Sequence, residues 1–200
     1  MKRLLLLFVP ILVVLSAGAT GASAQGAAPA ADQTAPSYDM KAQALQDLEI
    51  VQKKMVALAN AVPVDKFTWR PSPDSRSFAE VFLHVAGERY QILGLGGAVS
   101  PADFNGKTYE KSTTDRAEIV AQLNKTWDFA EKTINGMSNA DFAKLLPKLG
   151  PQANAGDVVY ILVADAHEHL GQLVAYARVN GVVPPWTTEA QKKAAEKKAP

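Results

Sequence analysis

Residues 77–93 read SFAEVFLHVAGERYQIL, and this stretch has the signals of an amphipathic helix. Ser77 and Glu80 have the spacing of a capping box, in which each side chain accepts a hydrogen bond from the other residue's backbone N–H at a helix start. The apolar residues that follow recur at the three- and four-residue steps of an amphipathic helix. They are Phe78, Val81, Phe82, Val85, Ile92 and Leu93. The stretch therefore predicts a helix that ends in the glycine-rich segment 94–97.

Three further segments repeat this helical period, at about 38–61, 114–136 and 154–180. A short turn or partial helix is expected over 139–146, and 98–113 is a long polar connection. The last long helix is apolar nearly all round, so we expect it to be the most buried. No segment shows the alternation typical of a strand, and the chain is predicted to be all-α.

Matched helix lengths favour a four-helix bundle. Helices of about 20 residues are each ~30 Å long at 1.5 Å per residue. The connection over 98–113 is longer than a tight helical hairpin needs, so it permits a crossover between helices 2 and 3 as well as simple up-and-down order. Residue pattern alone leaves both orders open.

The two ends of the chain differ from the predicted bundle, which spans residues 38–186. Residues 1–24 have a charged start, a short apolar run and an Ala-x-Ala exit, which are typical of a secretory signal peptide cleaved after Ala24. An uncleaved membrane anchor is the alternative, but the apolar run is short against the ~20 residues needed to span a bilayer. Residues 25–37 are expected to be a disordered linker, and 187–200 a polar tail. The protein is therefore expected to be exported, to the periplasm or beyond, with no stable membrane span in its mature form.

Composition excludes several classes of function. The chain has no cysteine, so it has no disulfide, thiolate nucleophile or thiolate metal ligand. It carries 21 basic and 20 acidic residues, and removing Lys2 and Arg3 with the signal peptide leaves 19 against 20. A nearly neutral domain lacks the basic surface that binding to nucleic acid requires.

The chemistry-bearing residues are histidines and carboxylates inside predicted helices. His84 and Glu88 are four residues apart on the second helix, as are Asp165 and His169 on the fourth, so each pair shares a helix face. If these two helices pack side by side, His84, Asp165 and His169 converge. The remaining histidine, His167, is expected on another face, at the surface.

Two imidazoles and one carboxylate suit a divalent transition metal with open coordination positions. Zn²⁺ is the first choice, and Ni²⁺, Fe²⁺ and Mn²⁺ are the alternatives. Glu88 is then the nearest candidate for a catalytic proton-transfer group, or for a partner that orients an imidazole. Pattern alone leaves open a buried polar network, or histidines at a wet mouth of the bundle, without any metal.

Several segments resemble the DinB/YfiT-like superfamily. FTWRP at 67–71, followed by SFAEVFLHVA at 77–86, resembles the entry to that family's second helix and its ligand histidine. ADAHEHLGQL at 164–173 is similar to the family's histidine-rich helix, which ends in His-x-Gly-Gln. YARVNGVVPP at 176–185 resembles the ending of an exported branch. The resemblance covers about residues 38–186.

This resemblance implies a four-helix bundle with crossover order and a divalent metal site lined by three histidines. By position, His84 and His169 match two of the ligands, and Asp165 stands where the family often has the third histidine. The carboxylate can still bind a metal, or it can mark a branch that has changed or lost its metal. Homodimers through bundle faces are common in such folds.

Two functions follow, from different classes. The first is a metal-dependent hydrolase or thiol-transferase-like enzyme that acts on an unknown small molecule, and export favours hydrolysis slightly. The second is a non-catalytic bundle in the cell envelope that binds a small ligand or a partner protein.

Overall fold

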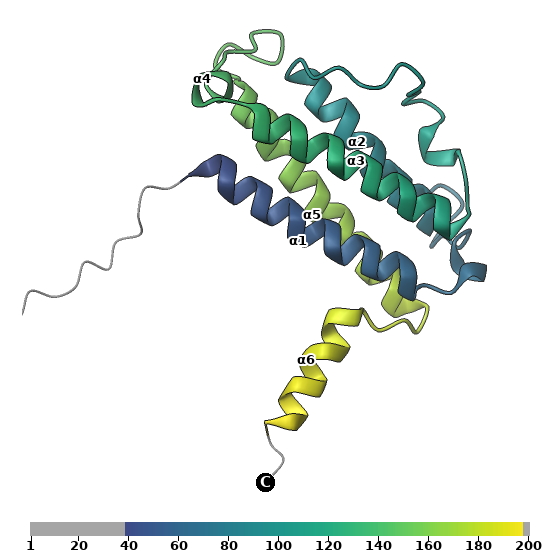
Figure 1. Cartoon of the computed structure of the whole chain (residues 1–200). Coiled ribbons are helices and arrows are strands. Elements are labelled where there is room, and N and C mark those ends of the chain that lie inside the picture. The colour runs from purple at the N-terminus through teal and green to yellow at the C-terminus, as the bar shows by residue number, and fades with distance from the viewer. Residues whose placement is uncertain (1–38, 198–200) are drawn as a thin grey trace, which may run out of the picture. The chain divides into compact units, whose positions relative to one another are not determined.

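The computed structural model describes residues 39–197, apart from the side chain of residue 195, and this part of the chain is helical (Figure 1). The four long helices are α1 (Met40–Ala61), α2 (Phe78–Leu95), α3 (Arg116–Gly136) and α5 (Ala155–Val179). The shorter helices are α4 (Asn139–Phe142), α6 (Pro185–Glu196) and the 3₁₀ turns η1 (Val64–Lys66) and η2 (Tyr109–Lys111). Extended pairing within the described residues is limited to one isolated bridge, between Leu145 and Asn154. The predicted all-α class is confirmed.

Each long helix packs mainly against two others. Helices α1 and α2 both contact α3 and α5, so α1 lies diagonally opposite α2, and α3 lies diagonally opposite α5. Near the start of α2, Phe78 contacts Tyr176 at the end of α5, with ring centroids 5.5 Å apart. These two helices are therefore antiparallel neighbours.

The connection between α2 and α3 is a crossover. Lys41 Nζ at the start of α1 donates to the carbonyl of Met137 at the end of α3, so α1 and α3 are antiparallel. The chain leaves α2 at Gly96 and travels back along it until Glu110 accepts a hydrogen bond from Arg76, just before α2 begins. Helices α2 and α3 consequently run in the same direction (Figure 1). The predicted crossover is confirmed.

Local capping explains where these helices start. Ser77 and Glu80 form both hydrogen bonds of the predicted capping box, and Asn154 and Asp157 form a second one on α5. The Asp115 side chain accepts from the backbone N–H of Glu118 at the start of α3. All three starts agree with the sequence-based predictions. Helix α1 begins at Met40, and the predicted start at residue 38 lies outside the described residues.

Apolar side chains from all four long helices form one core. The prediction that the last long helix is the most buried was wrong: 12 of the 18 residues of α2 are buried, against 11 of the 25 residues of α5. The reason is packing. The crossover connection covers a face of α2, whereas Tyr160 and Ile161 of α5 are exposed. None of the described helices combines the length and apolar content needed to cross a membrane.

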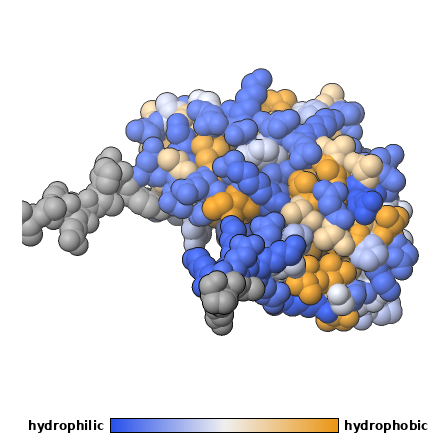
Figure 2. All heavy atoms as spheres, turned by 60° about the horizontal axis from the view of Figure 1, so that its bottom comes forward, coloured by the Kyte–Doolittle hydropathy of each residue, from blue (hydrophilic) through white to orange (hydrophobic). Residues whose placement is uncertain are grey.

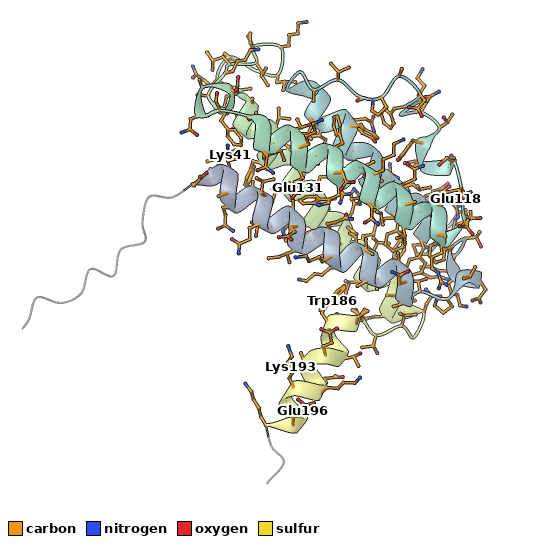
Figure 3. All side chains as sticks on the ribbon, viewed as in Figure 1. Lys41, Glu118, Glu131, Trp186, Lys193 and Glu196 are labelled. Carbon is orange, nitrogen blue, oxygen red and sulfur yellow. The ribbon has the colours of Figure 1, made fainter. Side chains whose placement is uncertain are left out.

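Of the two predicted end segments of the chain, only the C-terminal one lies largely within the described residues. The predicted signal peptide (1–24) and linker (25–37) lie outside the described residues. At the other end, the expected polar tail includes most of α6, a helix that was not predicted from the sequence. Alanine, lysine, glutamate and glutamine are all good helix formers, and Pro185 suits a first helical position. Trp186 packs against the core where α6 meets α1 (Figure 3).

The surface beside α6 is mixed in character. Figure 2 shows hydrophobic areas on this face that are separated from one another by hydrophilic side chains.

Candidate metal centre

His84 of α2 and Asp165 and His169 of α5 converge in one cluster, as their spacing predicted. One donor atom from each residue lies within 4.8 Å of the other two. The imidazole rings of His84 and His169 meet edge to face, with centroids 4.6 Å apart and planes at 86°. The antiparallel packing of α2 on α5 brings together residues that are far apart in the sequence.

The cluster is largely but not completely shielded from water. The side chains of His84, Asp165 and His169 are 15%, 19% and 11% exposed. A site of this kind weakens the competition of bulk water for the donors, while the side chains remain partly exposed.

His169 is oriented by a chain of hydrogen bonds along α5. The side-chain oxygen Oε1 of Gln172 lies 2.8 Å from Nδ1 of His169, and Gln172 Nε2 donates to the hydroxyl of Tyr176 at 2.9 Å. Because the amide nitrogen is engaged with Tyr176, Oε1 faces the ring and accepts a hydrogen bond from Nδ1–H. The second nitrogen, Nε2, then faces Asp165.

This arrangement raises the pKa of His169. The main cause is the hydrogen bond to Asp165, which burial opposes and the contact with Gln172 reinforces. In the absence of a cation, the protonated ring can donate from both nitrogens. A metal ion would have to displace the proton on Nε2.

Asp165 gives the clearest indication that the three side chains suit a cation. Its Oδ1 lies 3.4 Å from His169 Nε2. Its Oδ2 is buried and has no hydrogen-bond partner among the described residues. An unsatisfied buried oxygen of a charged group is costly, so it indicates a site for a cation or another donor.

His84 is surrounded differently. Its Nδ1 lies 3.4 Å from Glu110 Oε2 and 3.7 Å from Glu88 Oε1. Its pKa is lowered, chiefly by burial and then by the positive charge of Arg76. A lowered pKa favours the neutral imidazole, the form that binds metals.

Glu88, the sequence-based candidate for proton transfer, lies beside the donor cluster and is not one of its three donors. Its pKa is raised, first by burial and then by the negative charge of Asp165. A carboxyl group of this kind takes up a proton more readily than an exposed glutamate.

Two residues at the site were not identified from the sequence. Gln172 is three residues after His169 on the same helix, so its contact with the ring could have been found from helical spacing. Glu110 lies in the crossover connection, whose path depends on tertiary packing, and no local signal places it at His84. His167 is exposed, as expected.

The FTWRP segment supports the site through aromatic packing. The Trp69 ring contacts Tyr176 edge to face at 5.3 Å and Phe78 at 5.9 Å. Tyr176 in turn holds Gln172, which holds His169. The segment before α2 is thus linked to a candidate metal ligand on α5.

The donors fit a divalent transition metal. Two imidazole nitrogens and a carboxylate oxygen are the ligand types of open Zn²⁺ sites, and the same set suits Fe²⁺. Bonds of ~2.1 Å to one ion bring ligand atoms closer together than 4.8 Å, so binding requires a small inward movement of the side chains. Three residues of this chain could therefore form a metal site.

Comparison with known proteins agrees with this architecture. A search of curated proteins found no match. The family model described as the DinB superfamily matches residues 47–173, which run from α1 into α5 and include His84, Asp165 and His169. The match covers more than half of the chain, and the protein belongs to the DinB superfamily.

Proposed function

We propose that this protein binds one divalent metal ion, with Zn²⁺ as the first choice, through His84, Asp165 and His169. We further propose that it is a metal-dependent hydrolase of a small molecule. The main support is that Asp165 Oδ2 is buried without a hydrogen-bond partner among the described residues, in a cluster whose other donors are two imidazoles. When bound at such an open site, the ion supplies Lewis acidity to a water molecule or a substrate oxygen.

The residues of the chain would share the remaining work. Gln172 holds the His169 ring with its Nε2 toward Asp165, which leaves this nitrogen as the metal donor. Asp165 supplies the only negative charge among the three donors. Hydrolysis is favoured over thiol transfer because an exported protein lies outside the thiol pool of the cytosol.

Glu88 is proposed as the proton-transfer group. Its Oε1 lies 3.7 Å from His84 Nδ1. Its raised pKa makes the carboxylate a stronger base, and therefore a better proton acceptor, than an ordinary glutamate. The Glu88→Gln variant is expected to retain the metal and to lose most hydrolytic turnover. A variant that loses the metal as well would assign Glu88 to binding instead.

Export is proposed from the sequence of residues 1–24. Cell fractionation should recover the protein outside the cytoplasm, and N-terminal sequencing of the mature form should begin at Gln25. Recovery of the intact chain from membranes would support the anchor instead.

Elemental analysis of the untagged protein tests metal binding. Wild type is expected to carry close to one divalent ion per chain, and the His169→Ala variant to carry almost none. His167→Ala is the matched control because His167 is exposed on the same helix, and it should retain the ion. A metal-free wild type whose melting temperature is unchanged by Zn²⁺, Ni²⁺, Mn²⁺ and Fe²⁺ would overturn the proposal.

Turnover separates the enzyme from the alternative function. The metal-loaded protein should hydrolyse at least one member of a panel of esters, amides and phosphoesters, and His169→Ala should not. Bound metal without any turnover would favour the non-catalytic bundle.

A further inference from the structure

The crossover connection reaches the metal centre through one side chain. Glu110 belongs to η2, and its Oε2 lies 3.4 Å from His84 Nδ1. The connection belongs to no long helix of the bundle, yet it supplies the carboxylate nearest to this imidazole nitrogen. Glu88 on α2 is farther away, at 3.7 Å.

Glu110 is held in place by a cation. Arg76 Nε donates to Glu110 Oε2 at 2.9 Å, and both side chains are partly buried. Arg76 comes just before α2, so this ion pair joins the start of that helix to the returning connection. The pair fixes the carboxylate beside His84.

Tyr109, the residue before Glu110, holds η2 against α2 and α3. The hydroxyl of Tyr109 donates to Gln122 Oε1 of α3 at 2.7 Å. The Tyr109 ring lies so close to Gly87 of α2 that a Cβ at this glycine would be only 3.0 Å from the ring carbon Cδ1. Gly87 thus allows the connection to approach α2 one turn from His84.

The chemical role of such a carboxylate follows from how histidines bind metals. A histidine ligand usually donates its second ring N–H to a carboxylate or carbonyl, which sets the tautomer and the ring orientation. His169 already has this arrangement, because its Nδ1 faces Gln172. His84 acquires the equivalent arrangement if its Nδ1–H faces Glu110, and its Nε2 is then the donor left for a metal.

We propose that Glu110 is a positioning residue of the metal centre, which holds His84 in the Nδ1–H tautomer and makes the crossover connection part of the site. The inference concerns the tautomer and orientation of His84 and rests on the proposed metal function.

The tautomer is measurable without any metal. Nitrogen-15 NMR of the metal-free full chain at pH 8 distinguishes Nδ1–H from Nε2–H imidazole. Wild type should show His84 mainly as Nδ1–H, and Glu110→Ala should move it toward Nε2–H. Glu110→Gln retains an amide oxygen that accepts a hydrogen bond, so it should restore much of the wild-type signal. Identical His84 signals in wild type and Glu110→Ala would overturn the inference.

Metal affinity and spectrum provide the second measurement. Competition with a chelator should show that Glu110→Ala weakens Co²⁺ binding about tenfold or more, the range known for such partners of histidine ligands. The visible absorption bands of the bound Co²⁺ should also shift. Glu131→Ala, which changes an exposed glutamate on α3, is the matched control and should leave both unchanged (Figure 3).

A double-mutant cycle tests whether Arg76 acts through Glu110. The changes in Co²⁺ affinity caused by Arg76→Met and Glu110→Ala at pH 8 should not be additive, because both substitutions remove the same ion pair. Fully additive changes would contradict the inference.

The outcomes separate the two proposals. If wild type and Glu110→Ala bind Co²⁺ equally well and with the same spectrum, the proposed role of Glu110 is wrong and the proposed metal binding is unaffected. Wild type that binds no Co²⁺ overturns the proposed function and, with it, the assignment of Glu110 to a metal centre, whatever the tautomer measurement shows.

Discussion

At the scale of single residues, Arg89 and Asp165 both have buried polar atoms, but the surroundings of these atoms are opposite. The Arg89 guanidinium is almost fully buried, and it donates to Gln52 Oε1 and the Leu123 carbonyl at 2.7 Å and to Thr126 Oγ1 at 3.2 Å. Asp165, in contrast, has one buried oxygen without a partner. Arg89, whose guanidinium is hydrogen-bonded, joins helices and is structural, whereas Asp165, whose Oδ2 has no partner, marks the candidate site.

Replacing Arg89 should destabilise the fold. Arg89→Met leaves Gln52 Oε1 buried without its donor, and we expect a loss of about 2–4 kcal/mol in the free energy of unfolding. Urea unfolding of the metal-free protein measures it. Arg178→Met, at an exposed position on α5, should change the same quantity by less than about 0.5 kcal/mol. A loss below about 1 kcal/mol for Arg89→Met would contradict this assignment.

Metal affinity should depend on pH through His169. The pKa of this histidine is raised above its ordinary 6.5, first by the hydrogen bond to Asp165, so protons compete with the ion at a higher pH than they would at an ordinary histidine. Affinity should be constant well above the raised pKa and fall about tenfold per pH unit below it. The pKa of His84 is lowered, so its protonation should add to the loss only under more acidic conditions.

Competition titrations with Zn²⁺ between about pH 5.5 and 8 measure this profile, a window chosen to bracket the ordinary pKa of histidine. His167→Gln should give the wild-type curve because His167 is exposed. A flat profile across the range would show that His169 is not a ligand.

At the scale of helices, a capping box predicted the start of α2, and the helical period placed the starts of α3 and α5 near residues 114 and 154. Capping depends on residues three positions apart, so it is written locally in the sequence. The burial of α2 and the position of Glu110 were not predictable in this way, because both depend on where the crossover connection packs. The cluster of His84, Asp165 and His169 could be predicted in part. Asp165 and His169 share a helix face because they are four residues apart, and the only further condition is that α2 packs against α5.

Two capping residues should differ in their contributions to stability. Ser77 is buried at the start of α2, whose first turns enter the core, whereas Ser138 is exposed and α4 has no buried residue. Ser77→Ala should therefore lower the free energy of unfolding by about 1–2 kcal/mol, and Ser138→Ala by no more than about 0.5 kcal/mol. Urea unfolding of both variants tests the difference. Equal losses would show that the buried setting of the cap adds nothing.

At the scale of the whole molecule, the candidate site and α6 belong to different parts of the structure. The three donors lie between α2 and α5, inside the segment 47–173 that matches the DinB superfamily. Helix α6 begins after that segment and contacts the bundle mainly through α1. Lys54 of α1 lies over the Trp186 ring, 5.6 Å from its centroid. The attachment of α6 therefore involves its first turn.

Two truncations should separate this first turn from the rest of α6. A chain that ends at Trp186 should unfold with a free energy within about 0.5 kcal/mol of the full chain, because the later residues of α6 are mostly exposed. A chain that ends at Pro184 loses Trp186, which packs on the core and contacts Lys54, and should lose about 1–2 kcal/mol. Urea unfolding and elemental analysis measure both, and the metal content should be unchanged throughout. A loss of stability or metal in the chain that ends at Trp186 would instead make the whole of α6 part of the functional bundle.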